Sequence, residues 1–327
     1  MPDLTANLPL KDQQKSNIII EAIKSLGLIW VVIILCAVAY YLNPNFMNLG
    51  NLLNVSRQIA LVGIVSIGMT FVILTKGIDL SVGSIVGVVA VSSAILLANG
   101  WSIPLVFVFA LLLGGLFGAF NGLGITLVQM PPFIMTLGTL VMGRGIAMTI
   151  ANGEPQSIKA AAETFSFLGG GFFLGLPVPV WIFVAIALLS AFVLRMTSFG
   201  RAVYAVGSNT EAARLAGINV PATLFSVYTI SGVLAGLTAL IVVSRLTVGE
   251  PTAGINLELE AISIVVIGGT SLFGGEGGVK GTIIGAAIIA LMANILNLLG
   301  ITPFTQQIVK GAIILAAVGF EVWRHRK

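Results

Sequence analysis

Long apolar runs alternate with short polar stretches along most of the chain. An α-helix needs about 20 predominantly apolar residues to cross the hydrocarbon core of a bilayer, and most of the runs approach that length. The pattern therefore predicts ten membrane-spanning helices. The eighth run is short and rich in glycine, so we expect it to be broken or to enter only part of the membrane. The predicted spans are 25–42, 59–75, 82–98, 103–127, 132–151, 178–194, 222–243, 261–272, 281–299 and 306–320.

Composition supports the same class of protein. Hydrophobic residues make up 57% of the 327 residues and charged residues 9%, whereas a soluble protein carries about a quarter charged residues. The length would allow two soluble domains, but a polytopic bundle uses it as one domain. The 39 glycines fit a bundle in which membrane helices approach closely. We therefore predict an all-α, polytopic membrane helical bundle.

Charge indicates which loops face the cytoplasm. Basic residues lie near both chain ends and in the loops at 76, 195–214 and 280, while acidic residues prevail in 152–177 and 245–260. Because cytoplasmic loops carry an excess of Lys and Arg, both termini are predicted to be cytoplasmic. The first apolar run lacks a cleavage site and is interpreted as a retained span. The predicted organisation is a cytoplasmic segment 1–24, a transmembrane domain 25–321 with an inner loop at about 197–221, and a cytoplasmic tail 322–327.

Residues that commonly carry catalysis or bind metals are scarce. Cys36 lies in an apolar run, and His325 lies in the basic end of the chain. One residue of each type is too few for a zinc site or a Ser-His-Asp triad. The glycine-rich stretch 268–278 lacks the G-x-x-x-x-G-K-[ST] pattern that binds nucleotide phosphates. Nucleic-acid binding would need a basic stripe on a soluble module. We predict no catalytic, cofactor or metal site in this chain.

The loop after the sixth run carries the most specific pattern, G-S-N-T-E-A-A-R-L-A-G-I-N-V, from Gly207 to Val220. Glu211 and Arg214 are three residues apart and would share one face of a short helix. The alanines around them leave a face small enough for close approach by a partner. Gly217 would end the helix. The pattern indicates a short helix that docks on another subunit.

Four motifs resemble those of permease subunits of sugar-importing ABC transporters, most closely of the ribose type. They are G-I-D-L-S-V-G at 77–83, T-L-G-T-L with G-R-G in 136–145, the loop motif at 207–219 and I-G-G-T-S-L-F-G-G-E-G at 267–277. The resemblance covers about 44–318 and implies a type II ABC importer-like bundle in a bacterial inner membrane. It also implies two permease copies, two ATP-binding domains and a periplasmic or lipid-anchored sugar-binding protein. The residues it assigns to ATPase coupling are Gly207, Asn209, Glu211, Ala212, Ala213, Arg214 and Gly217.

Two charged residues stand at the predicted inner mouth. Asp79 would cap a helix that begins near Leu80, because a carboxylate suits a helix N-terminus. Lys76, at the end of the preceding helix, could pair with it. Structural capping and a contribution to a gate are both open interpretations for Asp79, and the two are compatible.

Arg144 and Asn121 lie inside or beside apolar runs. A charge in a membrane span is costly unless it faces water or a partner, so Arg144 would anchor helices, line the transport path or reach an interface. Gly143 and Gly145 would allow close packing around it. Asn121 would hydrogen-bond between helices or contribute to the path.

The outer loops hold further charges. Glu250, Glu258 and Glu260 lie in the predicted outer segment 245–260 and are candidates for docking the binding protein, because charges at the rim of an interface steer encounter. A solvated loop without a partner is the alternative.

The function that the sequence favours is ATP-driven import of a monosaccharide, ribose or a related sugar. Family members for ribose, xylose and allose share these motifs, so the particular sugar stays open. The alternative is an ion-coupled secondary transporter of a small solute, which would need an intramembrane carboxylate or a broken-helix ion site. The sequence shows no convincing site of that kind, nor the selectivity filter of a channel.

Overall fold

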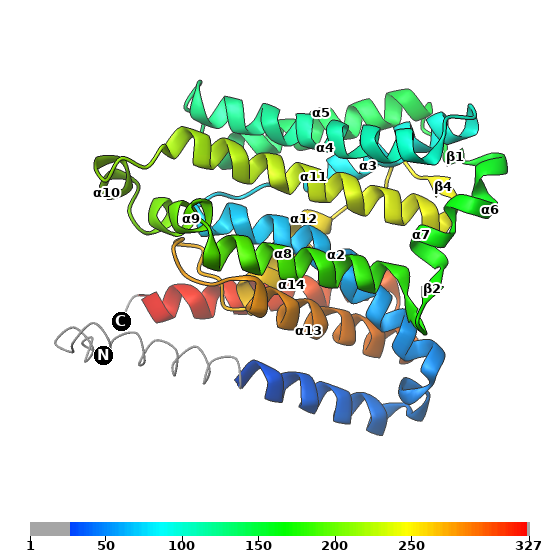
Figure 1. Ribbon diagram of the computed structural model, residues 1–327. Coiled ribbons are helices and arrows are strands. Elements are labelled where there is room, and N and C mark those ends of the chain that lie inside the picture. Colours follow the sequence, from blue (N-terminus) through cyan, green and yellow to red (C-terminus); the bar gives the residue numbers. More distant parts are fainter. Residues whose placement is uncertain (1–26, 326–327) are drawn as a thin grey trace.

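The computed structural model describes residues 27–325 and shows a bundle of long helices with small elements at its two ends (Figure 1). Each of the ten predicted spans overlaps a helix, and six of these helices are long and apolar enough to cross a membrane. The helices are Gly27–Leu42, α2 (Leu49–Leu74), α3 (Val82–Ala98), α4 (Ile103–Thr126), α5 (Pro132–Ala151), α8 (Val178–Met196), α11 (Val220–Leu246), α12 (Leu257–Ile267), α13 (Val279–Leu298) and α14 (Pro303–His325).

The shorter elements gather at the two ends of the bundle. At the end labelled by α6 and β1 in Figure 1 lie two small antiparallel sheets, β1 with β4 and β2 with β3. At the opposite end lie α9 (Ser198–Ser208) and α10 (Thr210–Leu215). The remaining elements are η1 (Pro44–Met47), β1 (Gln156–Ser157), η2 (Lys159–Ala161), α6 (Ala162–Phe165), α7 (Phe167–Gly170), β2 (Phe172–Phe173), β3 (Leu176–Pro177) and β4 (Val248–Gly249).

Helix α3 forms part of the core of the bundle. Nearly all of its side chains are buried, and it packs against α4, α5 and α11. A helix that is apolar on every side can be buried on every side, because it has no polar face that requires water. This explains why a helix of only 17 residues keeps its place inside the molecule.

Helices α4 and α11 meet along a row of small residues. On α4, Ala110, Gly114 and Gly118 recur at intervals of four residues and face α11. A side chain at Gly118 would collide with the carbonyl oxygen of Tyr228, and one at Gly232 with that of Gly114. Membrane helices depend on van der Waals contact for their association, and glycine lets two backbones approach closely. The row therefore determines where the two helices cross.

The structure corrects some predicted boundaries. The eighth helix, α12, is short as expected, but it starts at Leu257 and ends at Ile267, and residues 268–272 form turns. At a rise of about 1.5 Å per residue its 11 residues cover about half the hydrocarbon thickness. Helix α2 begins ten residues earlier than predicted, because Asn48 caps it through its side chain.

The predicted terminal segments lie largely outside the described residues. Residues 1–24 and 326–327 belong to that part of the chain, while 322–325 continue α14. The C-terminal end of α14 lies at the same end of the bundle as α10 (Figure 1).

Candidate functional site

The segment α10 is a short helix that is capped at both ends. The side chain of Asn209 accepts a hydrogen bond from the backbone nitrogen of Ala212 at 3.0 Å. At the other end, Gly217 has a φ of 81° and donates to the carbonyl of Arg214, while Ile218 donates to that of Ala213. These two bonds form a Schellman motif, whose left-handed residue is usually glycine. The predicted stop at Gly217 is confirmed.

The two faces of α10 differ in exposure. Glu211 and Arg214 form an ion pair of 2.7 Å, and both side chains are about 70% exposed. Ala212 is also exposed, but Ala213 is buried against Val206 and Val220 of the same chain. Leu215 is 83% exposed. An outward surface for a partner therefore consists of the ion pair, Ala212 and Leu215, whereas Ala213 holds the helix on the bundle.

Gly207 belongs to a joint beneath α10 rather than to its exposed surface. It is buried at the end of α9, where a side chain would collide with the carbonyl oxygen of Leu74, the last residue of α2. The same carbonyl accepts a hydrogen bond from Gly275 at 3.0 Å. Lys76 donates to the carbonyl oxygen of Ser208 at 3.1 Å. The joint thus connects α9 with the end of α2 and with the turn before α13.

Asp79 is completely buried in the turn between α2 and α3. Its Oδ1 accepts hydrogen bonds from the backbone nitrogen and the hydroxyl group of Ser81, at 3.0 and 2.6 Å. Its Oδ2 accepts from Ser231 of α11 at 2.8 Å. Asn121 of α4 donates to the Ser81 hydroxyl at 2.8 Å and accepts from Thr139 of α5 at 2.6 Å. This polar network joins the start of α3 with α4, α5 and α11.

The network changes two expectations. Ser81, not Asp79, is the N-cap residue of α3, and Asp79 instead forms a side-chain turn with the backbone of Ser81. The suggested pairing of Lys76 with Asp79 is wrong, because Lys76 bonds to Ser208 and Asp79 to two serines. Burial raises the pKa of the Asp79 carboxyl group, and the hydrogen bonds from Ser81 and Ser231 oppose that shift. Asp79 and Asn121 both lie inside the bundle of one chain, between packed helices.

Arg144 connects α5 to α3 and to the loop between β4 and α12. Its Nη1 atom lies 2.6 Å from the carbonyl oxygen of Pro251 and 3.0 Å from that of Ala253. Its Nη2 atom lies 3.4 Å from the carbonyl oxygen of Gly83 on α3. Gly143 packs against Ser84 as expected, but no atom outside the helix backbone would lie within 4 Å of a Cβ at Gly145. The contacts are those of an anchor between a helix and a loop.

The three glutamates of the segment 250–260 have different surroundings. Glu258 is buried beside Gly83, and Arg144 acts on it electrostatically. Glu260 forms a 3.1 Å ion pair with Lys310 of α14. Glu250 accepts a hydrogen bond from Thr252 at 2.8 Å and is partly exposed. Of the three, Glu250 is the one that is neither buried nor in an ion pair, and the expectation that Glu258 is available for docking is corrected by its burial.

Lys310 and Leu215 are residues that the sequence reasoning missed. Lys310 interrupts the last apolar run, and the cost of a charge in a span would have indicated a partner such as Glu260. Leu215 follows Arg214 directly, but the helix was too short for periodicity to show which way the leucine faces.

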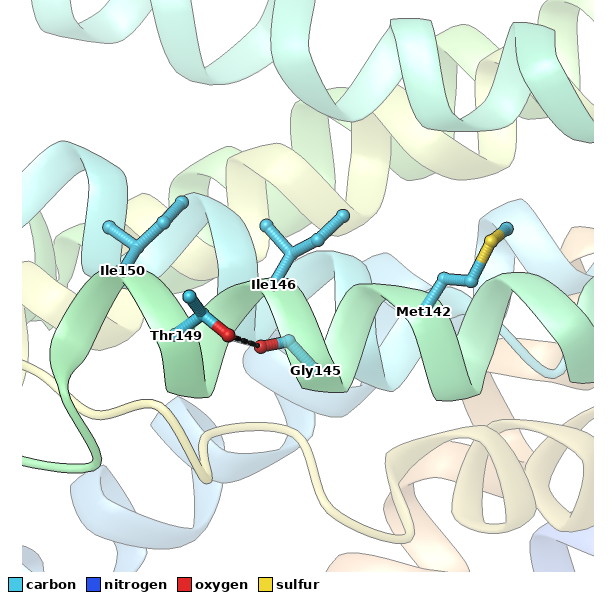
Figure 2. Close-up of a pocket in the computed structure, with 5 residues that line it drawn as sticks. All are labelled: Met142, Gly145, Ile146, Thr149 and Ile150. Carbon is cyan, nitrogen blue, oxygen red and sulfur yellow. Dashed lines mark hydrogen bonds between the residues drawn. The ribbon is translucent and has the colours of Figure 1, made fainter.

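Figure 2 shows a hollow on α5 that is lined by Met142, Gly145, Ile146, Thr149 and Ile150. Its lining is mostly apolar, and the hydroxyl group of Thr149 is bonded to the carbonyl of Gly145 at 2.8 Å. A sugar requires several hydrogen-bonding groups to orient its hydroxyls. This hollow therefore does not have the chemistry of a sugar pocket.

The chain is thus a polytopic membrane protein, with a capped helix exposed at one end of its bundle. The chain belongs to the family described as "Branched-chain amino acid transport system / permease component", whose model matches residues 51–318. It is therefore the permease component of an ABC importer, a multi-pass protein of a bacterial inner membrane, and not itself an enzyme.

Named relatives agree with this family. The chain is 43% identical to the ribose import permease protein RbsC of Haemophilus influenzae, over 88% of this chain and 90% of that protein. It is 41% identical to RbsC of Bacillus subtilis, over 94% of this chain and 96% of that protein. The xylose transport system permease protein XylH of Escherichia coli is 35% identical, over 91% of this chain and 93% of that protein. No solved structure matches the chain significantly.

Proposed function

We propose that this permease imports a monosaccharide, ribose or a close relative, using ATP hydrolysed by a separate subunit. Support for the sugar comes from the similarity to two ribose permeases at 41–43% identity, which exceeds the 35% to the xylose permease. The functional complex would contain a second copy of this or a similar permease, ATP-binding subunits and an external sugar-binding protein. Both termini would lie in the cytoplasm.

The main support for binding to an ATPase subunit is the geometry of α10. An exposed leucine beside an ion pair gives this helix an apolar contact and two charges, on a loop where basic residues predominate. Interfaces commonly combine a buried apolar anchor with a polar rim. Leu215 would enter the ATPase groove, and Glu211 and Arg214 would lie at its edge.

Transmission would follow the joint beneath α10. Gly207 leaves no free space against Leu74, and Leu74 is bonded to Gly275. A displacement of α10 and α9 would therefore press on the end of α2 and on the turn that precedes α13. Packed elements respond to such a displacement by moving as rigid bodies, because closely packed interiors compress little.

The test is uptake of labelled ribose into proteoliposomes that contain the permease, its ATPase and the binding protein. We expect uptake to require ATP and to be insensitive to collapse of ion gradients. Leu215→Ser combined with Glu211→Ala should lower both ATPase copurification and uptake, while membrane expression stays normal. Arg195→Ala, an exposed charge at the end of α8, is the matched control.

Two results would count against this function. Uptake that persists without ATP and follows an ion gradient would support the secondary transporter instead. Full ATPase copurification with the Leu215 and Glu211 double variant would remove α10 from the interface. Calorimetry of the binding protein against pentoses and hexoses would identify the sugar independently of both results.

A further inference from the structure

A small aromatic hairpin protrudes from the outer end of the bundle. It consists of β2, a two-residue turn at Leu174 and Gly175, and β3. Phe172 and Phe173 are 51% and 56% exposed, and Leu174 at the tip is 77% exposed. Three consecutive apolar residues are thus presented outward on an element that connects α7 to α8. Such a patch outside the helices usually contacts a partner or a membrane.

The hairpin is held in a defined position. The indole nitrogen of Trp181, in the first turn of α8, donates to the carbonyl oxygen of Phe173 at 2.9 Å. The two rings also meet edge to face, with centroids 6.1 Å apart. Leu174 has a φ of 49° and Gly175 a φ of 78°, as a two-residue hairpin turn requires. The exposed side chains therefore belong to a fixed structure.

The residue at the tip is itself informative. Positive φ disfavours leucine, and asparagine, aspartate or glycine would occupy this turn position with less strain. Water would also favour a polar residue there. A leucine that meets neither preference indicates that the tip of the hairpin lies in an apolar environment.

The hairpin continues the lipid-facing surface of α8. The outward face of this membrane-spanning helix carries large exposed apolar side chains, among them Trp181, Leu188, Leu189 and Phe192. Figure 1 places β2 at the end of α8 that lies away from α9 and α10. Tryptophan and other aromatic residues concentrate where membrane meets water, because their rings combine an apolar body with polar or quadrupolar edges.

Two arginines lie beside the hairpin. The guanidinium group of Arg57 lies over the ring of Phe172, 5.4 Å from its centroid, and donates to the carbonyl oxygen of Gly170 at 3.5 Å. Arg245 is close enough to repel Arg57 electrostatically and donates to the side chain of Asn54 at 3.1 Å. Within residues 27–325 neither arginine forms an ion pair with a carboxylate, and Nε of Arg57 is buried without a partner. Two neighbouring guanidinium groups of this kind favour an anion, and a phosphate suits their planar geometry.

We propose that the β2–β3 hairpin is an anchor in the outer leaflet of the membrane and that Arg57 and Arg245 bind the phosphate of a phospholipid headgroup beside it. The rings of Phe172 and Phe173 and the side chain of Leu174 enter the interface, at the depth where α8 leaves the hydrocarbon. The anchor holds the outer end of α8 at a constant depth while the inner ends of the helices move.

A membrane fits this surface better than a protein does. The apolar residues are continuous with a lipid-facing helix, whereas the exposed outer charges Glu154, Lys159 and Glu163 lie on the preceding part of the loop. A soluble binding protein would be expected to meet those charges first.

The depth of the hairpin can be measured with a fluorescent label. Cys36 is the only cysteine of the chain, so Leu174→Cys in a Cys36→Ala background gives a single thiol for an environment-sensitive dye. In nanodiscs without partner proteins, the label should emit at shorter wavelength than in water. Nitroxide lipids labelled near the headgroup should quench it strongly, and aqueous iodide only weakly. Glu154→Cys, an exposed polar position in the same outer loop, is the control and should show the reverse pattern.

Three outcomes would overturn the membrane anchor. Leu174→Cys could be quenched by iodide as strongly as the control, which would place the tip in water. It could become shielded only when the sugar-binding protein is added, which would make the hairpin a docking site for that protein. It could be shielded from both quenchers in nanodiscs, which would indicate burial against a second copy of the permease.

The phosphate contact is tested separately. Phosphatidylglycerol should raise the unfolding temperature of the detergent-solubilised permease more than an uncharged glycolipid with the same chains. Arg245→Gln should remove most of that difference, and inorganic phosphate should not replace the lipid. An unchanged difference in Arg245→Gln and in Arg57→Gln would contradict the headgroup site, even if the hairpin enters the membrane.

Discussion

The guanidinium group of Arg144 and the carbonyl oxygen of Pro251 lie 2.6 Å apart, although 107 residues separate them in the chain. Two further carbonyl oxygens, of Ala253 and Gly83, complete the contacts of the arginine. The buried carboxylate of Glu258 lies in its electrostatic field. Arg144 therefore joins α5, α3 and the loop before α12, and the charge and the carbonyl groups compensate each other's burial.

Replacement of Arg144 should weaken this connection. We expect Arg144→Leu to reduce the free energy of unfolding by about 2–4 kcal/mol, because several carbonyl groups lose their hydrogen-bond donor and the buried Glu258 loses a favourable charge nearby. Arg144→Lys should restore only part of the loss, since an ammonium group cannot reproduce the planar fork. Thermal unfolding in detergent measures the stability of both variants. Uptake of labelled sugar at matched expression measures their transport. Thr149→Val, on an exposed part of α5, is the control. Wild-type stability and uptake in Arg144→Leu would show that these contacts contribute to neither property.

The close approach of α4 and α11 should tolerate no added side chain. Gly118→Ala places a methyl group against the carbonyl oxygen of Tyr228, so the helices must separate. Overpacking of this kind costs about 1–3 kcal/mol. Gly138→Ala, on α5, meets no atom within 4 Å and should leave stability unchanged or slightly raise it, because alanine favours the helix. Equal unfolding temperatures for the two variants would contradict the role of the glycine row.

The carboxyl group of Asp79 should make stability depend on pH. Because burial raises its pKa in the folded protein, the folded state binds the proton more tightly than the unfolded state. Stability from this group is therefore greatest below the unfolded pKa of about 4 and declines as pH rises through the folded pKa. We expect Asp79→Asn to remove this contribution, which a comparison of unfolding temperatures across pH would reveal. An identical pH profile for wild type and Asp79→Asn would contradict it.

Two hydroxyl groups on α11 allow the hydrogen bonds around Asp79 to be tested by substitution. Ser231 donates to Asp79, whereas the hydroxyl group of Tyr228 is buried without a partner. Ser231→Ala should cost about 1–3 kcal/mol because it removes a bond to a carboxylate. Tyr228→Phe should be neutral or stabilising, because it removes an unsatisfied group. Equal losses in the two variants would show that the distinction between them is wrong.

Outer charges should affect encounter with the binding protein according to their exposure. Glu250→Lys should slow association, more so at low salt, because screening reduces steering by charge. Glu258→Lys should instead destabilise the fold, since its side chain is buried near Arg144. Surface plasmon resonance with permease nanodiscs, at two salt concentrations, measures the first effect and thermal unfolding the second. A salt-independent, unchanged on-rate in Glu250→Lys would favour a merely solvated loop.

The hydrophobic pattern alone predicts where most helices lie. The predicted bounds of α3 and α5 agree with the structure, and those of α4, α8 and α13 differ by two residues or fewer at either end. This is possible because the cost of placing a polar residue in lipid acts on each segment separately. The stop at Gly217 was also readable, since a left-handed turn needs glycine within the segment itself.

The functional surroundings of single residues depended on the tertiary structure. The sequence showed that Asp79, Arg144 and Glu258 are charged residues in an apolar chain. It did not show that two serines bond to Asp79, or that Arg144 lies near Glu258. Ser231 and Pro251, which bond to Asp79 and Arg144, lie far from them along the chain and come close only when the helices pack against one another. Burial of Ala213 and exposure of Leu215 likewise follow from how α10 rests on α9 and α11. The local pattern of apolar residues determines which segments enter the membrane as helices. Contacts between two helices depend on where the helices cross, and small residues on both helices determine that place together.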